Sequence, residues 1–452
     1  MGKYFGTDGI RGIAGDGLDA ELAFRIGRAA ATALAQVGEN RSNVMIARDT
    51  RISCDMLESA LTAGLCSAGA DVKLIGVLPT PAAAFLTLKS GANMGVVISA
   101  SHNPYEHNGI KLFGKNGFKL SDALEDRIEQ LIDDDSGVCR KTGGDLGRID
   151  NVHEFWRDVY IKSLASFSEG HYAGRIAIDC ANGASKTTAR SIFRELGAEF
   201  EIISDDPNGV NINENCGSTH PGALCELMKT GRFHVGFAFD GDADRCLVVD
   251  ERGEPVDGDM ILAVLARTMK ASGTLKNAAI VGTVNSNSGM DIFACNNGFT
   301  FHRAQTGDRN VLEMMWETGC NLGGESSGHI IFSDDATTGD GQLTAIKFLN
   351  VLTASGKLVS ELTADIPRYP QVMPSYVLTG GAAERDAIMS SPLLREEIAR
   401  QQDLLAGEGR VMIRPSGTEP VIRVLVEAKT HALAAEKAEC FLNLMKTLSE
   451  KI

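Results

Sequence analysis

NVMIARDTRISCDMLESALTAGLCSAGADVKLIGV, residues 43–77, contains the pattern that decides the fold. Its apolar run 43–47 is typical of a buried strand, residues 56–69 place apolar side chains at helical spacing, and residues 71–77 again read as a strand. A helix between two short strands predicts a β-α-β unit, and such units build mostly parallel sheets. We therefore expect an α/β fold.

The same alternation continues on both sides of this stretch. A helical pattern covers 18–36, a strand is expected at 94–100, and further cycles of helix and strand begin near 153 and 253. Past the proline-marked DIPRYPQVMPS, two strands and one long helix are typical of a small α+β domain. We expect α/β domains at 1–152, 153–252 and 253–368, and an α+β domain at 369–452.

Composition limits the function classes. The 452 residues include 44 Lys and Arg against 59 Asp and Glu, a formal net charge of −15, so most of the surface repels nucleic acid. The ten cysteines form no C-x-x-C pair, and no apolar stretch reaches the about 20 residues of a membrane span. We expect a cytoplasmic protein without a membrane or nucleic-acid partner, and any phosphate site must be local.

The most specific motif is AFDGDADRC, in which Asp240, Asp242 and Asp244 follow an apolar strand. Three crowded carboxylates invite a hard cation such as Mg²⁺, Mn²⁺ or Ca²⁺. A calcium loop is excluded because its sixth position, a required glycine, is Arg245, and because strands rather than helices are expected on both sides. The pattern favours Mg²⁺ and phosphoryl transfer.

Three other polar loops follow apolar runs at about one per domain. ISASHNP places Ser101 and His102 just after a strand, where we expect the serine to be exposed; its hydroxyl needs a base, a cation or prior phosphorylation to react. GGESSGH offers Glu325, Ser327 and His329 at alternate positions, which an extended backbone would point to one side. RPSGTEP, with Arg423 beyond it, combines groups that suit an anion; these are Arg414, Ser416, Gly417 and Thr418.

Together with the opening GTDGIRG, which carries Arg11, these ordered loops resemble the α-D-phosphohexomutase family over essentially the whole chain. The resemblance implies three similar α/β domains with mixed sheets and a smaller C-terminal α+β domain around a central cleft. RAQTGDRNVLE and NCGSTHP resemble the branch acting on glucosamine phosphates, although Ser326 stands where that branch usually has Gln. Mutases of glucose or mannose phosphates are the alternative within the family.

The resemblance also implies the roles of individual residues. Ser101 would be the phosphoserine, and one Mg²⁺ per chain would bind Asp240, Asp242, Asp244 and a phosphoserine oxygen. The transferring phosphoryl group would lie near Arg11, Lys111 and Arg245, and Glu325 and Ser327 would hold sugar hydroxyls. The distal phosphate, which is the one that does not react, would bind at Arg414, Ser416, Gly417, Thr418 and Arg423. Lys111, His329 and His102 remain open as proton donors or acceptors. A hexose bisphosphate would be the intermediate.

Two readings from other classes stay open. A phosphoenzyme that admits water becomes a phosphate-ester hydrolase, which would release inorganic phosphate without forming an isomer. A non-catalytic phosphosugar sensor would need neither Ser101 nor the three aspartates, and both are present. Whether two chains pair as a homodimer is left open by the sequence.

Overall fold

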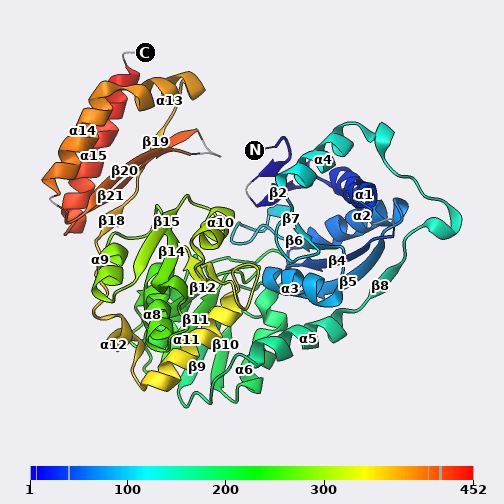
Figure 1. Ribbon diagram of the computed structural model, residues 1–452, viewed down its shortest axis with the longest axis horizontal. Helices are drawn as coiled ribbons and strands as arrows, with labels where there is room; N and C mark the ends of the chain where they lie inside the picture. Colours follow the sequence, from blue (N-terminus) through cyan, green and yellow to red (C-terminus); the bar gives the residue numbers. More distant parts are fainter. Residues whose placement is uncertain (1, 7, 39–40, 406, 417–419, 451–452) are drawn as a thin grey trace. The chain divides into compact units, whose positions relative to one another are not determined.

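The computed structural model describes residues 2–6, 8–38, 41–405, 407–416 and 420–450. Contacts between Cα atoms divide the chain into two compact units. The larger unit contains Met1–Asn285 and His302–Ala364, and the smaller contains Ser286–Phe301 and Asp365–Ile452. Within the described ranges the chain forms four sheets, each of which is drawn in Figure 1.

The first sheet has the order β1-β2-β7-β6-β4-β5-β8, with β3 beside β2. β4 is parallel to β5 and β6, whereas β7 is antiparallel to β6 and β2, so the sheet is mixed. Its elements are β1 (Phe5–Gly6), β2 (Gly9–Ala14), β3 (Gly17–Leu18), α1 (Ala20–Gln36), β4 (Asn43–Arg48), α2 (Cys54–Ser67), β5 (Asp71–Val77), α3 (Thr80–Ser90), β6 (Met94–Ile98), β7 (His107–Gly114), α4 (Asp122–Asp133) and β8 (Ile149–Asn151).

Helices cover both faces of this sheet, with α1 and α2 on one side and α3 on the other (Figure 1). The strands are therefore buried on both faces, which explains their unbroken apolar runs. The α1 and α2 backbones pack closely through two glycines. A Cβ at Gly64 would lie 2.1 Å from the Phe24 carbonyl oxygen, and one at Gly27 would lie 2.2 Å from that of Leu61.

The second and third sheets are mixed as well. The order of the second is β10-β9-β11-β12-β13, and that of the third is β15-β14-β16-β17. The second group contains α5 (His153–Ala165), β9 (Arg175–Asp179), α6 (Ala189–Glu195), β10 (Glu199–Ile203), α7 (Gly222–Met228), β11 (Val235–Phe239), β12 (Cys246–Val249) and β13 (Pro255–Val256). The third contains α8 (Gly258–Ala271), β14 (Ala279–Thr283), α9 (Gly289–Asn296), β15 (Thr300–Ala304), α10 (Asp308–Thr318), β16 (Leu322–Gly324), β17 (Ile330–Phe332), α11 (Gly341–Ser355) and α12 (Val359–Thr363).

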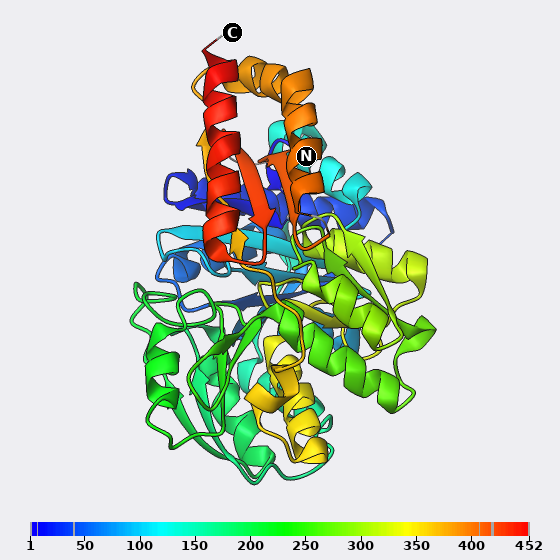
Figure 2. The same cartoon turned by 90° about the vertical axis from the view of Figure 1, so that its left-hand side faces the viewer.

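The smaller unit holds the last sheet, in which β18, β19 and β20 all pair antiparallel with β21. Figure 2 shows α14 and α15 packed side by side against one face of it. Its elements are β18 (Gln371–Val372), β19 (Ser375–Val377), α13 (Gly381–Ser390), α14 (Pro392–Leu404), β20 (Arg410–Pro415), β21 (Val421–Glu427) and α15 (His431–Ser449). None of the helices in the described residues combines the length and apolar character needed to cross a bilayer.

The α/β fold class with mixed sheets is thus confirmed. Short 3₁₀ turns at Asp135–Gly137, Gly143–Asp145, Ala184–Thr187 and Lys276–Ala278 complete the elements of the larger unit. The domain boundaries expected from the sequence and the arrangement around a central cleft stay predictions.

Candidate active site

The expected metal loop follows β11 and is flanked by strands, because β12 begins at Cys246. Asp240, Asp242 and Asp244 are buried, and each offers a carboxylate oxygen to a group whose atoms all lie within 4.8 Å of one another. Burial raises the pKa of Asp240 well above its usual range, and the neighbouring Asp244 and Asp242 raise it further. A cation would relieve this repulsion.

The donor set fits a hard divalent cation. The Oδ1 atoms of Asp242 and Asp244 are buried and have no hydrogen-bond partner among the described residues. The Asp242 Oδ2 accepts hydrogen bonds from Thr80 Oγ1 at 2.7 Å and from Lys111 Nζ at 2.8 Å, which hold the carboxylate in place. Three carboxylates, two of which keep an oxygen without a hydrogen-bond partner among the described residues, can bind a metal of the Mg²⁺ type.

Ser101 lies against this cluster, after β6. Its Oγ donates a hydrogen bond to Asp240 Oδ2 at 2.6 Å, and its backbone φ of 53° is in the left-handed region, which non-glycine residues seldom adopt. The expectation that Ser101 is exposed is wrong, because only 1% of it is accessible. The Asn213 side-chain amide donates to the Ser101 carbonyl oxygen at 2.9 Å.

Arg51 supports the same loop from inside the protein. Its guanidinium donates to the carbonyl oxygens of Ser101 and Asn103, both at 2.9 Å, and pairs with Asp49 at 2.8 Å. Arg51 is 1% exposed, so these hydrogen bonds are sheltered from water. Sequence reasoning missed Arg51, which lies outside every recognised motif.

Cations surround the aspartates and Ser101. Lys111, on β7, lies 2.8 Å from Asp242 and 3.0 Å from Asp8. Burial alone would lower the pKa of Lys111, but Asp242 and Asp8 raise it above its usual range. Arg11, on β2, pairs with Asp8, while Arg245 Nε lies 3.8 Å from Asp244.

The two histidines differ in charge at neutral pH. Burial, followed by Arg245 and Arg11, lowers the pKa of His102 to about 4, so its ring is neutral. The pKa of His329 would be lowered by burial, but Asp244, at 3.6 Å, raises it to about 9 and keeps the ring protonated. The neutral His102 can therefore accept a proton, whereas the protonated His329 carries a positive charge beside Asp244.

The third loop forms a tight turn rather than the extended backbone that the sequence suggested. The Gly328 amide donates to the Glu325 carbonyl oxygen at 3.0 Å, and Gly328 has a φ of 91°. The turn is required because β16 and β17 are antiparallel neighbours. The Glu325 Oε1 accepts from the Gly307 amide at 3.0 Å, and the buried Ser327 Oγ has no hydrogen-bond partner in the described part of the chain.

The fourth loop belongs to the smaller unit. Arg414 and Arg423 are directly opposite each other on β20 and β21. Burial, followed by the charge of Arg423, lowers the pKa of Arg414. Like charges placed in this way favour a bound anion. Ser416 follows β20, whereas Gly417 and Thr418 lie outside the described residues.

Comparison with known proteins decides the family. Models of phosphoglucomutase/phosphomannomutase alpha/beta/alpha domains I, II and III match residues 2–137, 158–253 and 257–369, and the model of the C-terminal domain matches 380–444. The chain belongs to the α-D-phosphohexomutase family. This phosphohexomutase is therefore an isomerase that transfers a phosphoryl group within its substrate.

Curated relatives resemble the phosphohexomutase over nearly their whole length. A phosphoglucosamine mutase of Shouchella clausii is 46% identical over 447 residues, which is 99% of each chain. One of Clostridium botulinum is 49% identical over 432 residues, or 95% of each chain. The resemblance to the glucosamine branch, stated from the motifs, is confirmed.

Solved structures share the fold. A phosphoglucomutase/phosphomannomutase family protein from Burkholderia thailandensis superposes with a TM-score of 0.81 at 26% identity, covering 98% of this chain and 97% of its own. The N-acetylphosphoglucosamine mutase of Aspergillus fumigatus, solved with GlcNAc-6P and magnesium, has a TM-score of 0.66 at 18% identity, covering 99% and 96%. At that identity the likeness concerns the fold alone.

Proposed function

We propose that this phosphohexomutase interconverts glucosamine 6-phosphate and glucosamine 1-phosphate through a phosphorylated Ser101 and a bisphosphate intermediate. The observation that carries the proposal is the 2.6 Å contact between Ser101 Oγ and Asp240, within a cluster of three buried carboxylates. The substrate is inferred from the glucosamine-specific names of relatives that are 46–49% identical. The product would supply amino-sugar and cell-wall precursor synthesis.

One Mg²⁺ per chain would bind Asp240, Asp242 and Asp244 together with an oxygen of phosphorylated Ser101. When bound, the ion stabilises negative charge on the transferring phosphoryl group. The protein adds Arg11, Lys111 and Arg245, whose fixed positive charges stabilise the same oxygens. The buried surroundings strengthen these interactions because water screens them poorly.

The proposed reaction consists of two successive phosphoryl transfers. The bond between phosphorus and Ser101 Oγ breaks while a sugar hydroxyl binds the phosphorus and loses its proton, which gives the bisphosphate. After the sugar turns over, the second phosphate returns to Ser101 and the other isomer leaves. Lys111, His329 and His102 are the proposed proton donors and acceptors, since all three surround the aspartates or Ser101.

Two further loops would hold the sugar. Glu325 and Ser327 are proposed to bind sugar hydroxyl groups. This is supported by Ser327 Oγ, which has no hydrogen-bond partner among the described residues. The opposed Arg414 and Arg423 are proposed to hold the phosphate that does not react, with Ser416 and with Gly417 and Thr418, which lie outside the described residues.

Comparing turnover of glucosamine, glucose and mannose 1-phosphates tests the substrate. The proposal predicts the highest kcat/KM for the glucosamine compound and little release of inorganic phosphate. Preference for glucose or mannose 1-phosphate would contradict the glucosamine assignment. Phosphate release without isomer formation would identify a hydrolase instead.

A further inference from the structure

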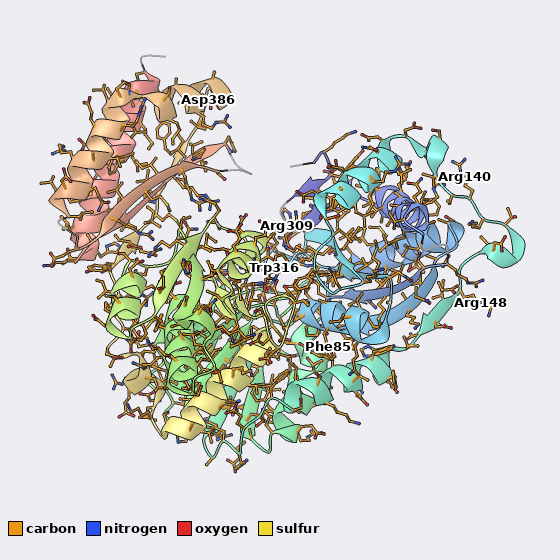
Figure 3. The ribbon with its side chains drawn as sticks, in the orientation of Figure 1. Phe85, Arg140, Arg148, Arg309, Trp316 and Asp386 are labelled. Carbon is orange, nitrogen blue, oxygen red and sulfur yellow. The ribbon has the colours of Figure 1, made fainter. Side chains whose placement is uncertain are left out.

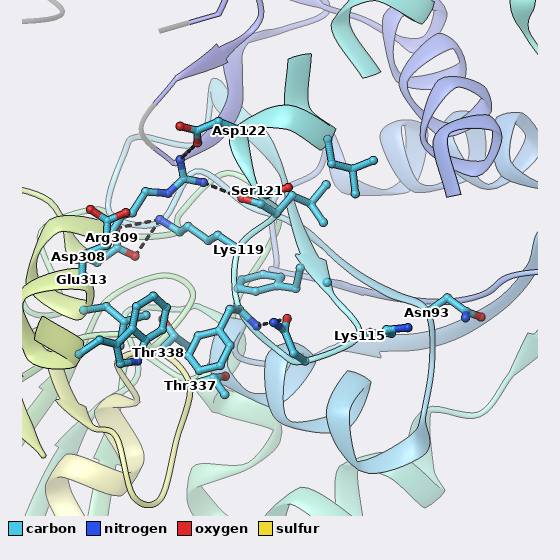
Figure 4. A pocket seen from close by; sticks show the side chains of 18 of the residues that line it. Asn93, Lys115, Lys119, Ser121, Asp122, Asp308, Arg309, Glu313, Thr337 and Thr338 are labelled. Atoms are coloured by element: carbon cyan, nitrogen blue, oxygen red, sulfur yellow. Dashed lines mark hydrogen bonds and ion pairs between the residues drawn. The ribbon is translucent and has the colours of Figure 1, made fainter. Parts of the chain in front are cut away.

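Lys119 joins two carboxylates that come from distant parts of the larger unit. Its Nζ lies 2.8 Å from Asp8 Oδ1 and 2.7 Å from Asp308 Oδ2, and the contact with Asp308 is visible in Figure 4. The Lys119 side chain is only 16% exposed, so water screens these ion pairs poorly. Lys119 therefore ties the N-terminal loop to the first residue of α10.

Each of these carboxylates leads to a group of the candidate active site. On one side, Asp8 Oδ2 lies 3.0 Å from Lys111 Nζ, which in turn contacts the metal-loop residue Asp242 at 2.8 Å. On the other side, Gly307, next to Asp308, donates its amide hydrogen to Glu325 Oε1 at 3.0 Å. Lys119 is the central cation of a continuous path from the metal loop to the sugar-binding carboxylate.

We propose that Lys119 is a positioning residue that fixes the separation between the phosphoryl-transfer groups and Glu325. This role rests on the proposed function, in which Glu325 holds the sugar while Ser101 and the aspartates deliver the phosphoryl group. Without Lys119, Asp308 would lose this cation and Asp8 would retain Lys111 and Arg11. A misplacement of about 1 Å between reacting groups costs about 10²-fold in rate.

Arg309 supplies a matched control because it links the same parts of the unit without entering this path. Arg309 lies on α10 (Figure 3), and its side chain and that of Lys119 both line a cavity of about 770 Å³ (Figure 4). The Arg309 guanidinium pairs with Asp122 and donates to the Leu120 carbonyl oxygen at 2.8 Å. If Lys119 served only to join α10 to the first sheet, loss of Arg309 would have the same effect.

The test compares Lys119→Met, Lys119→Arg and Arg309→Met in the full-length enzyme, using the hexose phosphate that the wild type turns over fastest. For Lys119→Met we expect kcat to fall about 100-fold while KM changes less than about threefold. Ser101 phosphorylation, read by intact mass, should be unchanged. Lys119→Arg should restore kcat to within about tenfold of wild type, and Arg309→Met should stay within about threefold.

Asp308→Asn provides a second variant in case Lys119→Met does not fold. It removes one charge partner of Lys119 with little change in volume, and we expect the same kcat-specific loss, by about tenfold. Unchanged kcat in the folded Lys119 or Asp308 variants, or an equal loss in Arg309→Met, would overturn the positioning role. The phosphoserine mechanism fails separately if wild-type enzyme never carries phosphate on Ser101, since that result does not depend on Lys119.

Discussion

Single residues at this site are held by contacts that motifs do not contain. Ser101 adopts a left-handed φ of 53° because Arg51 and Asn213 both donate to its carbonyl oxygen. Such a conformation is costly for a non-glycine residue and persists where the surroundings hold it in place. Part of what holds the proposed phosphoserine in position is thus a fully buried arginine fifty residues earlier in the chain.

Intact-mass analysis should find phosphate on part of the wild-type protein, and replacing Ser101 with alanine should remove it, together with nearly all mutase activity. The reason is that Ser101 Oγ is the hydroxyl lying 2.6 Å from Asp240, in the carboxylate cluster. Ser59→Ala, at an exposed position on α2, is the control and should keep both properties. A phosphorylated and fully active Ser101→Ala enzyme would contradict the assignment.

At the scale of elements, strand ends place the reactive loops and helices brace them. β6 leads to Ser101 and β11 leads to Asp240, while Thr80, the first residue of α3, bonds the Asp242 carboxylate. These loops were predictable because the motifs lie directly after apolar runs. The turn at 325–328 was not, because alternation at three positions also fits extended backbone.

Contacts between segments that are distant in the sequence could not be predicted from it. Lys119 lies more than a hundred residues from Asp8 and from Asp308 in the sequence, yet its amino group contacts both carboxylates. No sequence periodicity signals such a pair, because it depends on how separate elements pack. Likewise, the structure groups residues 286–301 with the C-terminal unit, without any composition change at those positions.

Removal of metal should abolish activity, and Mg²⁺ should restore it. Burial and the neighbouring carboxylates raise the pKa of Asp240, and a bound cation would relieve this repulsion. Mg²⁺ is expected because all three ligands are carboxylate oxygens. Activity is measured after chelation and back-titration with Mg²⁺ or Ca²⁺. Asp242→Asn should weaken Mg²⁺ binding while preserving the fold. Recovery with Ca²⁺ alone would contradict the Mg²⁺ assignment.

Gly64→Ala should destabilise the first sheet's helical layer, because the new Cβ would lie 2.1 Å from the Phe24 carbonyl oxygen and force α1 and α2 apart. We expect a loss of about 1 to 3 kcal/mol, typical of overpacking, measured as a lower thermal unfolding midpoint. Gly222→Ala is the matched control, since a Cβ at that position would meet no atom of the described residues within 4 Å. Equal midpoints for the two variants would contradict the close helix packing.

At the scale of the whole molecule, the residues of the proposed mechanism come from two compact units. Ser101 and the aspartates belong to the larger unit, whereas Arg414 and Arg423 belong to the smaller. One phosphoserine must act on both ends of the sugar, so the distal phosphate has to be held in each of two orientations. A guanidinium pair serves this purpose because it recognises phosphate without reading the sugar.

Arg414→Ala and Arg423→Ala should therefore raise the KM of the forward and reverse substrates together, by about 10- to 100-fold each, since a charge-assisted hydrogen bond contributes about 1.5 to 3 kcal/mol. Ser101 phosphorylation and Mg²⁺ affinity should survive, because their groups lie in the other unit. Steady-state kinetics in both directions measure the effect. A defect confined to one direction would show that the distal phosphate is held elsewhere.

The central claim is that Ser101 carries the transferred phosphoryl group, and a single-turnover experiment tests it most directly. Enzyme labelled with radioactive phosphate on Ser101 is mixed with unlabelled glucosamine 6-phosphate, and the label is followed on protein, sugar and inorganic phosphate. The account predicts that label leaves the protein and appears in the sugar bisphosphate and monophosphates within one turnover. Isomerisation with the label retained on the protein, or its release as inorganic phosphate, would contradict the account.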